Sequence, residues 1–195
     1  MRRTWLVMVA VAALVLDGGG AVAAGQRYED AVGDVLGDAP DIVAVTVEEA
    51  EYGPLFSISV EFGPERPFGS DMATYTDVIF VEMAAEPTVD ERGIMQSGIG
   101  YLTGTHGVTL KMQAEAGAHL LTPTGMYEQV VDVAVEGPVL TFTLDRQLID
   151  SPRDLYFQVL VGVERGEEVE GTDEGDVYPE LDVGPAHFEM GPSDW

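Results

Sequence analysis

The chain has no cysteine among its 195 residues. Disulfide bonds, thiolate metal sites and thiol nucleophiles are therefore excluded, and the fold must be stabilised by a hydrophobic core, for which this length is sufficient. Asparagine is absent as well, and Lys111 is the only lysine. Arginine does not compensate, because lysine and arginine together number 9 against 35 aspartate and glutamate residues. This deficit of positive charge indicates a surface composition under selection.

The formal net charge of −26 restricts the partners of the protein. Nucleic acids and anionic membrane surfaces both require a positive face, so we expect neither as a partner. Two environments favour such an acidic chain: a saline habitat, in which salt screens self-repulsion, or an exported surface that holds Ca²⁺. The acidic residues are spread along the whole chain. This distribution favours the saline habitat over a dedicated calcium-binding surface.

The chain also lacks a long apolar run. Trp5–Leu16, the longest, is shorter than the ~20 residues that a membrane-spanning helix needs. It follows two arginines and precedes a group of small residues, as in a cleavable signal peptide. We therefore predict a signal peptide at residues 1–23, with the mature chain beginning at Ala24 or Gly25 and located outside the cell or in the cell envelope.

Cleavage would make the chain more acidic. It removes Arg2, Arg3 and Asp17, which takes the formal net charge from −26 to −27. The Arg2-Arg3 pair partly resembles the twin-arginine signal of proteins exported already folded, but the general secretory route is the default. An uncleaved N-terminal anchor is the alternative to cleavage.

The motifs of common enzyme classes are missing. The sequence contains no G-x-S-x-G, H-E-x-x-H, Walker loop or G-x-G-x-x-G. Its histidines, His106, His119 and His187, do not have the spacing of a zinc site. We therefore predict no enzymatic activity and assign no catalytic or cofactor-binding residue.

Alternating apolar and polar residues recur throughout the chain, and Gly- and Pro-containing turns separate the runs. Phe56, Ile58, Val60 and Phe62, for example, would share one face of a strand. The pattern predicts an all-β antiparallel sandwich, jelly-roll or immunoglobulin-like, of about nine strands. The predicted strands are Ile42–Val47, Leu55–Phe62, Asp77–Met83, Gly98–Thr103, Gly107–Gln113, Ala118–Thr122, Val130–Val135, Val139–Leu144, Leu155–Val163 and Ala186–Met190.

The predicted domain organisation is simple. An acidic lead-in occupies residues 24–41, the β-sandwich residues 42–190 and a short tail residues 191–195. Two stretches, Gly25–Pro40 and Glu164–Asp182, are acidic and do not read as strands, so we expect surface loops there. A single helical turn is predicted at Arg146–Ser151, before Pro152.

Three stretches of the sequence resemble secreted bacterial β-sandwich domains. They are Tyr28–Val47, with its Asp-rich turn running into D-I-x-x-V-x-V, Leu140–Val159, and Asp176–Phe188, which ends in D-x-x-P…G…F. The chain is similar here to the group of family-9 carbohydrate-binding modules and DOMON domains. The resemblance implies a β-sandwich that binds sugar in some members and haem in others, the haem through a Met and a His. No motif fixes the position of a ligand residue in this chain.

Three aspartates at short spacing are the best metal hypothesis. Asp34, Asp38 and Asp41 precede the first predicted core strand, and their oxygens could surround Ca²⁺ there. They lack the order of an EF-hand loop. The alternative is a solvated turn, because aspartate is common in turns for local hydrogen-bonding reasons.

Several aromatic residues could form a sugar-stacking platform, although core packing explains most aromatics in a sandwich. The only tryptophans are Trp5, inside the predicted signal, and the terminal Trp195, which counts against sugar stacking. The candidate platform residues are Tyr52, Phe68, Tyr75, Tyr101, Tyr127 and Tyr178.

The sequence thus predicts a secreted, non-catalytic β-sandwich module with a binding or scaffolding role, and its composition leaves the oligomeric state open. The partner would be an extracellular polysaccharide or an envelope protein. The alternatives are a polysaccharide-binding module, an acidic calcium-binding surface protein with Ca²⁺ as its only cofactor, and a hydrolase whose carboxylates are not recognisable from spacing.

We expect the stability of the protein to depend on monovalent salt. The melting temperature should rise from low to molar NaCl in the presence of a chelator, because the Debye length falls to ~3 Å at 1 M and the surface carboxylates no longer repel one another. Thermal unfolding followed by circular dichroism measures this. A melting temperature that stays flat over the range contradicts the saline-habitat interpretation.

Overall fold

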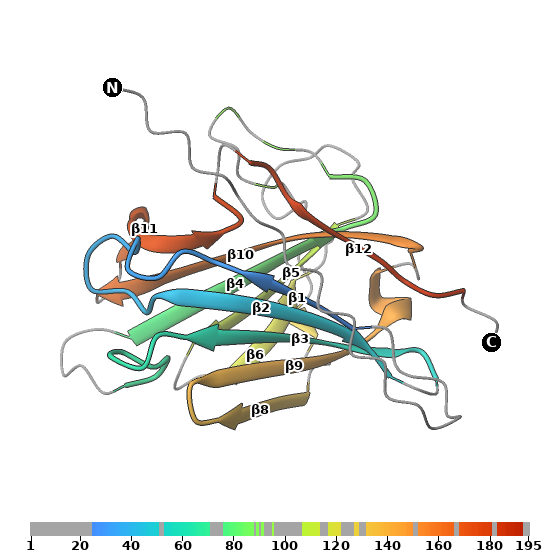
Figure 1. Ribbon diagram of the computed structural model, residues 1–195, viewed down its shortest axis with the longest axis horizontal. Coiled ribbons are helices and arrows are strands. Elements are labelled where there is room, and N and C mark those ends of the chain that lie inside the picture. The colour runs from blue at the N-terminus through green and yellow to red at the C-terminus, as the bar shows by residue number, and fades with distance from the viewer. Residues whose placement is uncertain are drawn as a thin grey trace.

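The computed structural model describes residues 25–50, 53–70, 76–87, 89, 91, 95, 107–113, 117–121, 127–128, 132–149, 152–165, 168–180 and 183–192. Within these ranges the chain forms twelve β-strands and one 3₁₀ turn, and every strand pairing is antiparallel (Figure 1). The strands make two sheets. The predicted all-β sandwich is confirmed, with twelve described strands in place of about nine.

The first sheet has five strands in the order β1-β2-β3-β9-β8. They are β1 (Gly25–Glu29), β2 (Ile42–Glu49), β3 (Leu55–Phe62), β8 (Asp132–Glu136) and β9 (Val139–Asp145). The strands β8 and β9 form a hairpin through Gly137, whose φ of 61° suits glycine. The 3₁₀ turn η1 (Arg146–Ile149) follows β9 and confirms the predicted helical turn.

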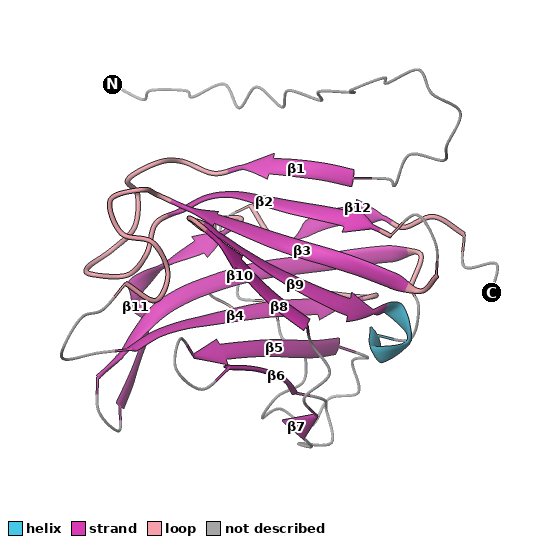
Figure 2. Cartoon of the chain, turned by 90° about the horizontal axis from the view of Figure 1, so that it is seen from below, coloured by secondary structure: helices cyan, strands magenta, loops and turns pink. Residues whose placement is uncertain are grey.

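The second sheet has seven strands. Their order is β11-β10-β4-β5-β6-β7, and the seventh strand, β12, also pairs with β10. Along β10, residues 154–157 pair with β12 and residues 159–165 pair with β11. The strands are β4 (Thr76–Ala84), β5 (Gly107–Gln113), β6 (Gly117–Leu121), β7 (Tyr127–Glu128), β10 (Asp154–Arg165), β11 (Glu168–Tyr178) and β12 (Ala186–Glu189). Figure 2 shows β1 and β2 on one side of the molecule and β5 to β7 on the opposite side.

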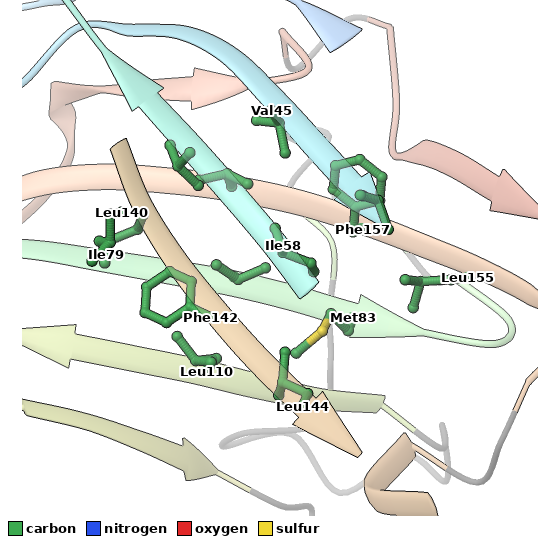
Figure 3. Packing of buried hydrophobic residues seen from close by; sticks show 14 of the residues in the cluster. Val45, Ile58, Ile79, Met83, Leu110, Leu140, Phe142, Leu144, Leu155 and Phe157 are labelled. Atoms are coloured by element: carbon green, nitrogen blue, oxygen red, sulfur yellow. The ribbon is translucent and has the colours of Figure 1, made fainter. Parts of the chain in front are cut away.

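The inner faces of the two sheets enclose one hydrophobic core. Along β3 the burial alternates residue by residue, and the four side chains predicted to share a face are all buried. Ile58 and Phe142 from the first sheet lie against Ile79 and Leu110 from the second (Figure 3). These four side chains are completely removed from water, and burial of this kind stabilises the fold by ~1.5–3 kcal/mol per large side chain.

Both segments predicted as acidic loops contain a strand. Residues 25–29 form β1 and residues 168–178 form β11, which lie at sheet edges. Sequence alternation misses them because an edge strand can be held by backbone pairing with few apolar residues. In β1 the one partly buried side chain is that of Tyr28. The remaining residues of the lead-in form turns and a loop, as expected.

The other strand predictions agree with the structure within a few residues, where the structure describes them. The predicted strand Gly98–Thr103 lies outside the described residues. No helix in the described part of the chain is long and apolar enough to cross a membrane.

The scarce arginines are placed against carboxylates. Every arginine whose side chain the structure describes forms an ion pair. The most buried is Arg146, which donates to the carboxylate of Glu49 and to the carbonyl oxygens of Pro152 and Gly191, thereby fixing the chain after β12. The pairs are Arg27 with Glu29 and Glu61, Arg66 with Asp77, Arg146 with Glu49, and Arg153 with Glu189.

The close approach of β11 to β10 depends on Gly175. A Cβ at this position would lie 2.3 Å from the carbonyl oxygen of Val161, which is backbone and cannot move aside. We expect Gly175→Ala to lower the free energy of unfolding by about 1–3 kcal/mol, the usual cost of overpacking. Urea unfolding measures the loss.

The matched control for this prediction is Gly25→Ala in β1. There the new Cβ would meet the flexible side chain of Glu48, at 3.1 Å from Cγ, and that side chain can shift. An equal loss of stability in the two variants would contradict the assigned role of Gly175.

Candidate metal centre

The loop between β1 and β2 lies against β11 of the other sheet. The backbone N–H of Leu36 donates to the carbonyl oxygen of Gly175 at 3.0 Å. Gly33 and Gly37 have φ of 82° and 75°, which only glycine adopts without strain and which lets the loop fold back on itself. The loop therefore brings its aspartates to the place where the two sheets meet.

Three carboxylates converge at this junction. Asp34 from the loop, Asp41 immediately before β2 and Asp176 from β11 each place an oxygen within 4.8 Å of the other two. Asp34 is exposed and Asp176 is buried, so the group reaches from solvent into the protein. All its ligand atoms are carboxylate oxygens, which are the donors that hard divalent cations prefer.

Backbone donors hold two of the three carboxylates in place. Asp176 accepts from the N–H of Ile42 at 2.5 Å through Oδ2 and from that of Val177 at 2.8 Å through Oδ1. Both oxygens of Asp41 lie 3.0 Å from the N–H of Gly33. These bonds fix the geometry of the group before any ligand arrives.

A glycine lies close beside Asp41. The N–H of Gly63 donates to the backbone oxygen of Asp41 at 2.8 Å. A Cβ at position 63 would lie 3.2 Å from Asp41 Oδ2. The loop after β3 therefore lies against Asp41.

A fourth carboxylate, Asp30, lies in the same electrostatic environment. Its Oδ1 accepts from the N–H of Ala31 at 3.0 Å, but its Oδ2 is buried without a hydrogen-bond partner. Burial, together with the charges of Asp176, Asp34 and Glu180, raises the pKa of Asp30 to about 7. An unpaired buried oxygen is costly and requires either a proton or a cation.

Two of the converging carboxylates are perturbed in the same direction. Burial and the charges of Asp34 and Asp41 raise the pKa of Asp176 to about 6. Burial and the charge of Asp41 raise the pKa of Asp34 as well. Burial and the neighbouring negative charges thus both oppose ionisation of Asp34 and Asp176, as expected in a partly buried site without a counterion.

The predicted set Asp34, Asp38 and Asp41 is only partly the set that the fold assembles. Asp34 and Asp41 belong to the converging group, whereas Asp38 does not. Asp176 takes part instead, from a position 134 residues beyond the start of β2 in the chain. Local spacing contains no signal for such a partner. The one signal for Asp176 in the sequence is the D-x-x-P stretch that it begins, which belongs to the family resemblance and has no metal-ligand spacing.

The histidines are not brought together with this group. His106 lies outside the described residues, and His119 and His187 belong to β6 and β12. His187 Nε2 lies 2.8 Å from Asp154 Oδ1 on the surface. In the part of the chain that the structure describes, no histidine belongs to a group of three or more converging metal ligands.

Two of the candidate sugar-stacking residues have side chains that the structure describes, and both pack against other aromatic rings and the core. Phe68 stacks on Phe62 at 5.5 Å between ring centroids, and Tyr178 lies 6.3 Å from Tyr28. Both are partly buried against the core. The side chains of the remaining four candidates, Tyr52, Tyr75, Tyr101 and Tyr127, lie outside the described part.

Comparisons with known proteins identify no relative. No protein-family model, curated protein or solved structure matches the chain. The converging carboxylates Asp34, Asp41 and Asp176, with Asp30 in their electrostatic environment, are the feature that points to a function.

We expect the metal-free protein to lose stability as the pH rises from about 4 to about 7. Asp30 and Asp176 have an ordinary pKa of 3.8 but titrate near 7 and 6 in the folded chain. The folded state therefore binds more protons than the unfolded state within this window, and stability falls as the pH rises through it. Urea unfolding at several pH values with chelator measures the loss.

The Asp30→Asn variant tests whether the loss comes from this site. It should be less sensitive to pH over the window, whereas Asp132→Asn on the exposed strand β8 should behave as wild type. Identical pH profiles for wild type and Asp30→Asn would contradict the role given to Asp30.

Proposed function

We propose that the chain is a secreted, non-catalytic β-sandwich module that binds Ca²⁺ where the β1–β2 loop meets β11. The observation that carries the proposal is the convergence of Asp34, Asp41 and Asp176 from both sheets. The buried, unpaired oxygen of Asp30 beside them supports it. A divalent cation would neutralise charges that otherwise repel one another in a partly buried site.

The irregular donor set favours Ca²⁺ over Mg²⁺. Ca²⁺ accepts irregular oxygen coordination, whereas Mg²⁺ requires a near-ideal octahedron and keeps several of its waters. The oxygens of the three converging aspartates lie within 4.8 Å of one another. They come from a loop, from the residue before β2 and from the strand β11, an arrangement that suits Ca²⁺ better than Mg²⁺.

The ion would act as a link between the sheets. Asp30, Asp34 and Asp41 flank strands of the five-stranded sheet, whereas Asp176 belongs to the seven-stranded sheet. A cation shared by these residues joins the two layers at one end of the sandwich. In a chain without cysteine, this link takes the structural place that a disulfide has in many secreted domains.

The proposed export favours calcium as the ion. Extracellular modules bind Ca²⁺ with dissociation constants of ~10⁻⁴–10⁻³ M. A site that is partly open at Asp34 and that has to displace protons from Asp30 and Asp176 suits this range.

The test is a calcium titration of the purified mature chain at fixed ionic strength. Calcium at about 100 times its dissociation constant should stabilise the fold by ~2.7 kcal/mol. This corresponds to a rise in melting temperature of about 5–10 °C for a domain of this size. Magnesium at the same concentration should give a smaller rise, and calorimetry should show a single site.

Charge-matched variants separate the site from the acidic surface. Asp176→Asn and Asp41→Asn should abolish the calcium-dependent rise, whereas Asp132→Asn should keep it. If all three variants respond as wild type does, calcium acts through the general surface charge and the proposed site is wrong.

A further inference from the structure

The strand β8 is an open edge of the five-stranded sheet. It pairs with β9 on one side, and in the part of the chain that the structure describes no strand pairs with its other side. Figure 1 shows it as the outermost strand, next to β9. We propose that β8 is a docking edge, to which a partner protein adds an extended strand that carries basic residues. The inference does not depend on calcium, because the converging aspartates lie beside β1 and β2, at the opposite side of this sheet.

The backbone of β8 directs hydrogen-bonding groups toward its open side. A two-residue turn joins β8 to β9, and Glu136 pairs with Val139 across it. In such a hairpin the closing pair exchanges both of its N–H···O bonds, and every second residue along the strand does the same. The residues between them, Val133 and Val135, therefore direct their N–H and C=O groups away from β9. These groups are the template on which an added strand forms.

The core side of β8 is only partly covered. Val133 lies opposite the buried Phe142 and packs against the core. Val135 lies opposite the buried Leu140 but is 61% exposed. Residues directly opposite each other on paired strands share one face of the sheet, so Val135 belongs to the core side although water reaches it. An apolar side chain on an added strand would lie beside Val135 and cover it, which favours docking through the hydrophobic effect.

The solvent side of β8 is acidic at both ends. Asp132, Ala134 and Glu136 are all exposed, and none of the ion pairs among the described residues includes either acid. Basic residues directly opposite these acids on a neighbouring strand would form cross-strand pairs of opposite charge. The edge therefore fits a strand with the pattern basic, apolar, any residue, apolar, basic. Its basic residues would lie opposite Asp132 and Glu136, and its apolar residues opposite the two valines.

The same charges oppose pairing of β8 with a second copy of itself. Antiparallel pairing centred on Ala134 would place Asp132 of each copy opposite Glu136 of the other. Like charges directly opposite each other destabilise a strand pair, and charged edge residues protect a sheet against self-association. The two acids thus select the partner, because they disfavour this chain and favour a basic strand.

The test measures the binding of a fluorescent peptide, with Lys-Val-Thr-Val-Lys at its centre, to the full chain. Fluorescence anisotropy at physiological ionic strength follows the titration. The control peptide has the same sequence with an N-methyl group on each valine, so that it keeps its charge but loses the donors that would bond to β8. We expect the control to bind at least ~10-fold more weakly, because two backbone hydrogen bonds are lost.

Variants of β8 locate the binding on this edge. Val135→Pro removes an N–H that points away from β9, so it keeps the β8–β9 ladder and should weaken binding at least ~5-fold. The double variant Asp132→Asn with Glu136→Gln should weaken binding about 3–10-fold. A charge-matched double variant at exposed positions elsewhere, Glu65→Gln with Glu86→Gln, should bind as wild type does.

Three outcomes overturn the inference. The first is that neither peptide binds. The second is that the peptide and its N-methylated control bind equally well, which means that the general negative charge attracts both. The third is that Val135→Pro, with its fold confirmed by circular dichroism, binds as wild type does. If Val135→Pro does not fold, the N-methylated control decides, because it leaves the protein unchanged.

Discussion

Repulsion between carboxylates at the junction of the two sheets is the constraint around which this end of the molecule is organised. Asp34, Asp41 and Asp176 converge there, backbone donors hold Asp41 and Asp176, and Asp30 keeps a buried oxygen without a partner. The core can hold the sheets face to face, but it does not remove this repulsion. Either protons or a cation must do so, and the cation links the layers while the protons do not.

The placement of the arginines reflects the same excess of negative charge. With 9 basic against 35 acidic residues, the fold places each arginine whose side chain the structure describes against a carboxylate. Arg146 and Glu49 fix the chain after β12 at one end of β2, and the aspartates lie at its other end. Among the arginines whose side chains the structure describes, none remains to neutralise the sheet junction, and we assign that role to an ion from solution.

Much of the fold could be predicted from the sequence, because the side chains of a strand such as β3 point alternately into the core and away from it, and the sequence alternates between apolar and polar residues accordingly. β3 and β5 were bounded correctly to the residue. The edge strands β1 and β11 were missed, since backbone pairing and a single anchor such as Tyr28 suffice for an edge. Asp34 and Asp41 were found from local spacing, but Asp176 was not, because its nearness depends on the packing of β11 against the β1–β2 loop.

The central claim is that these carboxylates form one cation site, and terbium luminescence tests it most directly. Tb³⁺ replaces Ca²⁺ at oxygen sites, and Tyr178, whose pKa burial and the charge of Asp30 raise to about 12, follows Asp176 by two residues in β11 and is the expected donor of excitation. The account predicts tyrosine-excited emission that saturates at one ion per chain, is displaced by Ca²⁺ and is lost in Asp176→Asn. Emission that grows without saturation and persists in that variant would contradict it.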